Sequence, residues 1–353
     1  MPLEIVRQDI TKMQVDVIVN TANPKPVVGG GVDSAVHRVA GKGLLAARRK
    51  IGVIGVGDAV STEAFGLPAK YVIHTVGPVW QDGRHHEADL LAACYRHSLI
   101  LAAKLRAKTI AFPLISAGTY GFPRDKAIST ALQTITDFLL TQEMTVYLVL
   151  FDGDSFLMGT KLFDHVKAYI DNHYSESALE SEYRDYPDYG GYALQGAMRR
   201  RRDRRKADAA AFSPADSEKA APQPFPVAPA LNLDDQLAQC GETWSESLLK
   251  LIDKTGKKDA DVYKKANVDR KLFSKIRTKK DYQPSKNTAL AFAVALQLSF
   301  EETCDFIRKA GFALTHSSKA DIIVEYYIKK RQYDINLINL TLFEFHQPTL
   351  GMK

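Results

Sequence analysis

Residues 20–41 read NTANPKPVVGGGVDSAVHRVAG and contain the parts of a phosphate-binding site in the order strand, loop and helix. An apolar run, Val15–Val19, leads into Asn20 and Asn23, and three glycines, Gly29–Gly31, precede a predicted helix. Glycines let the backbone approach a phosphate closely, and the first amides of a helix attract an anion. The stretch therefore predicts a site for a phosphorylated ligand, with a purely structural glycine turn as the alternative.

A second glycine loop strengthens this prediction. Residues 116–123 read SAGTYGFP, follow the apolar run Thr109–Phe112 and lead into a predicted helix that starts near Pro123. Two such loops beyond neighbouring strands can hold a diphosphate from opposite sides with backbone N–H groups. The pair therefore indicates a nucleotide longer than a single phosphate group.

The first half of the chain alternates short apolar runs with helical patterns. This alternation is typical of an α/β fold whose sheet is covered on both faces, with ligands beyond the carboxyl ends of the strands. The predicted strands are Leu3–Val6, Val15–Val19, Val60–Thr62, Tyr71–Val76, Thr109–Phe112 and Val146–Phe151, and the predicted helices are Val32–Ala40, Ala88–Leu105, Arg124–Leu140 and Phe156–His173.

Together with Asp9-Ile10-Thr11 at the end of the first predicted strand, the two loops resemble the macro domain family, and within it the MacroD-type ADP-ribosyl hydrolases. The resemblance covers residues 1–174. It implies a three-layer α/β/α fold with a mixed central sheet, ADP-ribose or an ADP-ribosylated substrate as the ligand, and no cofactor. The activity that it implies is hydrolysis of ADP-ribosyl linkages on protein or nucleic acid, or of O-acetyl-ADP-ribose.

The resemblance also assigns roles to individual residues. It implies that Asn23 and Asp33 contact the distal ribose and support catalysis, and that Asp9 accepts a hydrogen bond from the adenine amino group. Phe151 matches the aromatic residue of the family that packs against adenine. The alternative for Asp9 is an Asx turn, and the alternative for Phe151 is simple packing in the core. The ligand-binding residues that it implies are Asp9, Ile10, Asn20, Gly29, Gly30, Gly31, Val32, Ser116, Ala117, Gly118, Thr119, Tyr120 and Phe151.

One position departs from the family pattern, because Val28 stands where the family often has a fourth glycine. The spacing from Asn23 to Asp33 is unchanged, so the departure bears on rate and substrate range more than on fold. Since both of these polar residues are retained, hydrolysis is favoured over the second hypothesis, a reader that binds ADP-ribose without turnover.

The chain as a whole has 353 residues, 45% of them hydrophobic, and a net charge of +6. We expect two folded units and a cytoplasmic protein without a membrane segment or disulfide framework. Residues 175–241 show no apolar face and are predicted to be a flexible linker. Its basic run, Arg199–Lys206, is predicted to be solvated, with contact to nucleic acid or an acidic partner as the alternative.

Residues 242–353 show helical spacing almost throughout and predict an all-α domain. Within it, residues 262–277 resemble a repressor-type helix-turn-helix of phage and bacterial regulators, with Asn267 at the turn and Asp269 capping the second helix. DNA binding is the third functional hypothesis, and a plain packing unit is its alternative. The candidate DNA-binding residues are Arg270, Lys271, Lys275 and Arg277.

Overall fold

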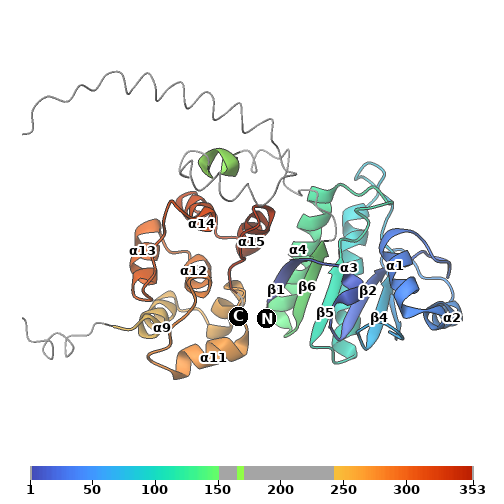
Figure 1. Ribbon diagram of the computed structural model, residues 1–353, viewed down its shortest axis with the longest axis horizontal. Coiled ribbons are helices and arrows are strands. Elements are labelled where there is room, and N and C mark those ends of the chain that lie inside the picture. Colours follow the sequence, from blue (N-terminus) through green and yellow to red (C-terminus); the bar gives the residue numbers. More distant parts are fainter. Residues whose placement is uncertain (1, 151–164, 171–241, 352–353) are drawn as a thin grey trace, which may run out of the picture. The chain divides into compact units, whose positions relative to one another are not determined.

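The computed structural model describes residues 2–150, 165–170 and 242–351 (Figure 1). These residues fall almost entirely in one unit, Met1–His173 together with Thr243–Lys353. Phe151, the predicted linker and most of the helix predicted at Phe156–His173 lie outside the described residues.

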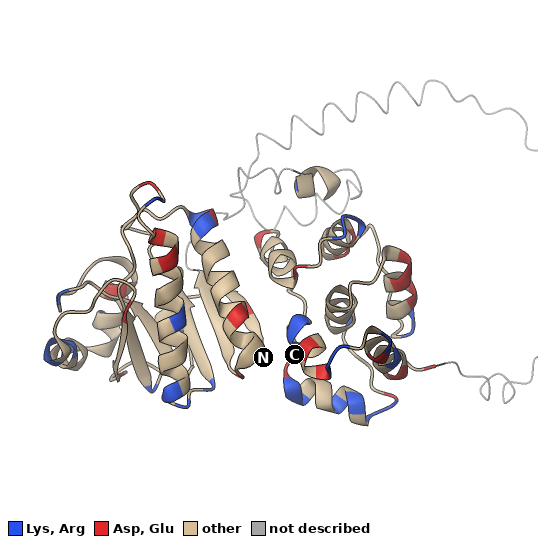
Figure 2. Ribbon diagram, turned by 180° about the vertical axis from the view of Figure 1, so that it is seen from behind, with Lys and Arg blue, Asp and Glu red and all other residues tan. Residues whose placement is uncertain are grey.

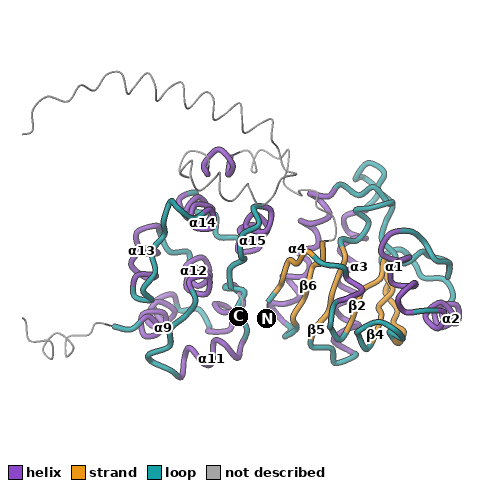
Figure 3. The backbone as a smooth tube through the Cα atoms, viewed as in Figure 1, coloured by secondary structure: helices purple, strands orange, loops and turns teal. Residues whose placement is uncertain are grey.

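A six-stranded sheet forms the centre of the first region, in the order β1-β6-β5-β2-β4-β3. Every neighbouring pair is parallel except β3 and β4, which are antiparallel, so the sheet is mixed as predicted. Figure 3 shows the strands side by side. They are β1 (Leu3–Arg7), β2 (Val17–Thr21), β3 (Ala59–Glu63), β4 (Tyr71–Thr75), β5 (Thr109–Pro113) and β6 (Thr145–Leu150).

Helices cover both faces of this sheet, because alternate strand residues point to opposite sides. Val17 and Val19 pack into the core shared with helices α3 and α4, whereas Ile18 packs into the core shared with α1 and α2. The predicted three-layer α/β/α fold is therefore confirmed. The helices are α1 (Gly31–Ala40), α2 (Lys42–Ile51), α3 (Glu87–Lys104) and α4 (Arg124–Thr141), and a short 3₁₀ helix, η1, spans Ile10–Lys12.

The second region is helical, as the spacing predicts. Aromatic side chains form its core: Trp244 contacts Phe292 and Phe306, and Phe273 contacts Phe292 and Tyr263. No helix in the described part of the chain has the length and apolar character that crossing a membrane requires. The helices are α9 (Trp244–Thr255), α10 (Asp259–Lys265), α11 (Arg270–Thr278), α12 (Lys286–Ala295), α13 (Phe300–Arg308), α14 (Lys319–Lys329) and α15 (Ile335–Glu344).

The turn between α10 and α11 has the conformation that the sequence predicts. Asn267 is left-handed, with φ of 54°, and Asp269 caps α11 by accepting the Leu272 N–H. The Asn267 side chain is buried and pairs with the backbone of Leu3 in β1, accepting its N–H at 2.8 Å and donating to its carbonyl at 3.1 Å. β1 is an edge strand, and the Asn267 amide pairs with the Leu3 N–H and carbonyl as a further strand would.

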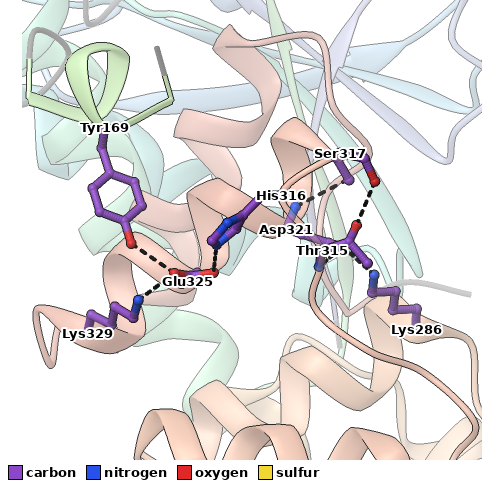
Figure 4. Close-up of polar contacts among 9 residues, drawn as sticks. Tyr169, Lys286, Thr315, His316, Ser317, Asp321, Glu325 and Lys329 are labelled. Atoms are coloured by element: carbon purple, nitrogen blue, oxygen red, sulfur yellow. Dashed lines mark hydrogen bonds and ion pairs between the residues drawn. The ribbon is translucent and has the colours of Figure 1, made fainter. Parts of the chain in front are cut away.

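Two buried carboxylates in α14 organise the polar interior of the helical region (Figure 4). Glu325 accepts hydrogen bonds from Tyr169, His316 and Lys329 at 2.5–3.0 Å. Asp321 forms an ion pair with Lys286 at 2.6 Å and accepts the N–H and hydroxyl of Thr315. Because each of these carboxylates is paired with a lysine and accepts further hydrogen bonds, we interpret the cluster as structural.

Candidate functional site

The two glycine loops lie at the same edge of the sheet. The first follows β2 and leads into α1, and the second follows β5 and leads into α4. Since β2 and β5 are parallel neighbours, their carboxyl ends meet at one edge. The sequence prediction that the loops follow neighbouring strands is therefore confirmed.

Asp33 organises the first loop from the first turn of α1, where a carboxylate is favoured by the helix dipole. The side chain is buried, and both of its oxygens have partners. Oδ1 accepts from the Asn20 amide at 2.6 Å, with His37 Nε2 at 3.5 Å, and Oδ2 accepts the Gly29 N–H at 2.5 Å. A carboxylate oxygen can accept two hydrogen bonds, so Oδ2 can still accept from a ribose hydroxyl or a water beside the Gly29 N–H.

Asn23 lies beside this loop, and the hydrogen bonds of its side chain are longer than those of Asp33. Its Nδ2 donates to the Val27 carbonyl at 3.2 Å, and its Oδ1 accepts from the Tyr120 hydroxyl at 3.4 Å. Tyr120 belongs to the second loop, so this contact brings the two loops together. The structure thus places Asn23 and Asp33 beside Gly29, with Tyr120 in contact with Asn23.

Beneath the loop, a buried polar chain connects Asp33 to the interior of the sheet. Asn20 donates one amide hydrogen to Asp33 and the other to His74 Nδ1 at 3.2 Å, and His74 Nε2 lies 3.0 Å from the Thr62 hydroxyl. Burial, reinforced by the positive charge of Arg48 and by His37, lowers the pKa of His74 to about 3. His74 is therefore neutral near pH 7, and its Nδ1 is free to accept from Asn20.

The second loop is shaped by a left-handed residue other than glycine. Ser116 has φ of 63° and is buried, and its hydroxyl has no partner among the residues that the structure describes. A Cβ at Gly77, just after β4, would lie 2.1 Å from the Ser116 hydroxyl, so only glycine fits there. Strain and an unpaired polar atom are typical of functional loops. Ala117 is partly exposed, and Gly118 and Thr119 are exposed beside it.

The residues predicted to bind adenine are described in part. Asp9 caps η1 by accepting the N–H and hydroxyl of Thr11 through Oδ1. The Thr11 hydrogen bonds, opposed by partial burial, lower the pKa of Asp9, so the group is ionised near pH 7. Asp9 therefore has the local geometry of the Asx-type alternative, and both hydrogen bonds from Thr11 go to its Oδ1. Ile10 follows within η1 and is buried, while Phe151 lies outside the described residues.

Two residues of the site are not predicted from the sequence. His74, at the centre of β4, belongs to the polar chain described above. Arg48, on α2, is buried and donates to the backbone carbonyls of Asn23, Pro24 and Gly52. Neither residue lies in a motif, and a histidine in an apolar strand or an arginine in a short helix carries no signal in a single sequence.

One group of residues has the composition of a metal site. Asp82, His85 and Glu87 place ligand atoms within 4.8 Å of one another. However, Glu87 already accepts the backbone N–H groups of Gly83 and His85 at 3.1 and 2.7 Å, among others. The group is thus explained as the turn that begins α3, and we assign no metal to it.

The four candidate DNA-binding residues all lie on α11 and are exposed. Lys and Arg gather along this helix in Figure 2, while Phe273 and Ile276 face the core. Arg277 forms an ion pair with Asp259, and Lys275 lies over the Tyr282 ring.

The fold and the two loops define an α/β protein with glycine loops at a parallel strand edge, which is typical of proteins that bind nucleotides. A family model described as "Macro domain" matches residues 19–131. A "Macro domain-containing protein" of Methanosarcina mazei is 50% identical over 155 residues, which cover 43% of this chain and 83% of that protein. The chain belongs to the macro domain family.

Other similar proteins carry more specific names. An "O-acetyl-ADP-ribose deacetylase" of Cronobacter sakazakii is 48% identical over 166 residues, which cover 45% of this chain and 92% of that protein. The solved structure "Oceanobacillus iheyensis macrodomain with ADP" is 38% identical, has a TM-score of 0.43, and covers 47% of this chain and 92% of its own.

Proposed function

We propose that this chain binds ADP-ribose and hydrolyses ADP-ribosyl linkages, with O-acetyl-ADP-ribose as the first substrate to test. The observation that carries the proposal is that Asn23 and Asp33 flank Gly29 and that Tyr120 contacts Asn23, at the edge where the two loops meet. The similarity to proteins named O-acetyl-ADP-ribose deacetylase, at 45–48% identity, supports the same reaction.

Each part of the proposed site has a physical role. The loop amides and the start of α1 would hold the diphosphate, because unpaired helix N–H groups bind anions. Asn23 and Tyr120 would orient the distal ribose, and Asp33 would accept from a ribose hydroxyl or from the attacking water. Hydrolysis of the acetyl ester consumes one water and yields acetate and ADP-ribose.

The test is acetate release from O-acetyl-ADP-ribose by the full chain and by Asn23→Ala and Asp33→Asn. We expect each substitution to lower kcat by about a hundredfold, the usual contribution of a positioned polar group. Asp125→Asn changes an exposed aspartate at the start of α4 and serves as the matched control. Absence of turnover by the unmodified chain would reject the hydrolase.

The reader hypothesis draws on one observation: each oxygen of Asp33 already accepts a hydrogen bond from the chain's own donors, which leaves fewer acceptor positions for an attacking water. Calorimetry with ADP-ribose separates the two functions. Tight binding without turnover of ester-linked, arginine-linked or DNA-linked substrates would identify a reader, and turnover of any of them would reject it.

A second candidate function, DNA binding, is favoured by the exposed cations of α11 and by the left-handed turn at Asn267. If each of the four cations contacts one phosphate, a plot of the logarithm of affinity against the logarithm of salt concentration should have a slope of about −4. The double variant Lys275→Glu, Arg277→Glu should abolish duplex binding measured by fluorescence anisotropy, whereas Lys104→Glu on α3 should not. Unchanged binding by the double variant would reject this function.

A further inference from the structure

Helix α2 places an arginine inside the protein. Leu44 and Arg48 lie one turn apart on the same face of the helix, and both are buried. Leu44 packs in the core between the sheet and α1, and Arg48, 2% exposed, lies at the next turn of that face. Its neighbour Arg49 is exposed. Burying a guanidinium is unfavourable unless the group is well paired, so the partners of Arg48 indicate its role.

The partners of Arg48 are backbone carbonyls of the segment that leaves β2. Nη2 donates to the carbonyls of Asn23 at 3.2 Å and Pro24 at 3.1 Å, while Nη1 donates to Gly52. The Pro24 carbonyl also accepts the Ile54 N–H at 3.0 Å. One planar guanidinium therefore fastens the Asn23–Pro24 backbone to the end of α2.

The charges around Arg48 are those of the proposed reacting centre. Asp33 attracts the guanidinium, and the guanidinium in turn disfavours protonation of His74. Burial lowers the pKa of Arg48 and Asp33 opposes that shift, but an arginine stays charged near pH 7. The cation is thus held where it can compensate the negative charge of the buried Asp33.

We propose that Arg48 is a positioning residue that fixes the Asn23 backbone, so that the Asn23 side chain meets the distal ribose. This inference rests on the proposed function. The side chain of Asn23 is itself held only by contacts of 3.2 and 3.4 Å, so its placement depends on its backbone. Lysine cannot replace Arg48, because a single ammonium lacks the planar fork that reaches three carbonyls.

The experiment compares Arg48→Lys and Arg48→Gln with Arg49→Lys and Arg49→Gln in the full chain. With O-acetyl-ADP-ribose, we expect kcat to fall by about a hundredfold in both Arg48 variants, because a displacement near 1 Å is enough for such a loss. KM and the affinity for ADP-ribose should change less than about threefold, since the diphosphate is held by the loop amides. The Arg49 variants should match the unmodified chain.

Hydrogen exchange of the Ile54 amide gives a readout that does not depend on activity. Its acceptor, the Pro24 carbonyl, is held by Arg48, so exchange at Ile54 should become about tenfold faster in Arg48→Gln. Exchange at Ile18 and Ile73 in the sheet should not change. If the unmodified chain shows no turnover, the proposed function fails, and Ile54 exchange still tests Arg48.

Three results would overturn the proposal. They are an unchanged kcat in both Arg48 variants, an unchanged exchange rate at Ile54, and acceleration at Ile18 and Ile73 equal to that at Ile54, which would make Arg48 only a stabilising residue. Should Arg48→Gln fail to fold, Arg48→Ala with added guanidinium replaces it. Recovery of kcat by guanidinium but not by methylammonium supports positioning, and no recovery by either contradicts it.

Discussion

Acidification should destabilise the protein through His74. The ring is fully buried, and its pKa is lowered to about 3 from the ordinary value of 6.5 by burial, Arg48 and His37, whose ring centroid is 6.4 Å away. The unfolded chain therefore takes up this proton first as the pH falls. The contribution of His74 to stability is complete above about pH 6.5 and is lost progressively as the pH falls toward 3.

The size of the effect follows from the two pKa values. Between about pH 7.5 and pH 5, a histidine whose pKa falls from 6.5 to about 3 on folding removes about 2 kcal/mol from the free energy of unfolding. Protonation would also place a hydrogen on Nδ1, the atom that accepts from Asn20, and would break the chain of hydrogen bonds to Asp33. Because the pKa of His74 in the folded protein is about 3, the proposed site should keep its geometry at pH 5 and lose it only as the pH falls toward 3.

Urea unfolding at both pH values measures this contribution. The sequence contains two tryptophans, so in a Trp244→Phe background the fluorescence of Trp80 reports on the α/β region alone. His74→Gln carries no titrating ring and should lose about 2 kcal/mol less than the parent between the two pH values. His85→Gln, which changes an exposed histidine, is the control. Equal losses in the parent and His74→Gln would refute the reasoning.

Three further predictions follow from packing and backbone geometry. Gly29→Ala would place a methyl group 2.7 Å from Asn23 Nδ2, so kcat should fall more than about tenfold while the melting temperature changes little. Trp244→Ala should cost about 3–5 kcal/mol in urea unfolding of the helical region, because its ring is buried between Phe292 and Phe306. Asn267→Gly should melt at a higher temperature than Asn267→Ala, since both lose the bonds to Leu3 but only glycine relieves the positive φ, a difference of about 1 kcal/mol.

The sequence predicts the layers and the loops well, because each strand is an apolar run and each loop is marked by glycine. It places the second strand at Val15–Val19, whereas β2 is Val17–Thr21. The polar residues Asn20 and Thr21 continue the pairing opposite His74 and Thr75, so the strand extends beyond its apolar run. That extension places Asn20 under the glycine loop.

Helix α2 is not predicted from the sequence, and the reason is physical. Only two of its residues are buried, Leu44 and Arg48, and an inward arginine interrupts the apolar spacing by which a helix is recognised. The polar chain from Asp33 to Thr62 cannot be predicted from the sequence for a different reason. Its members come from separate elements, and only the register of β2, β3 and β4 brings them together.

The buried Arg48 and the exposed cations of α11 should respond differently to ionic strength. Dissolved ions screen charges at the surface over about 10 Å in 0.1 M salt, but they do not enter a packed interior. Turnover at the loop edge should therefore stay constant over a salt range that releases any nucleic acid held by α11. A single salt titration of the full chain would separate the two proposed activities without any substitution.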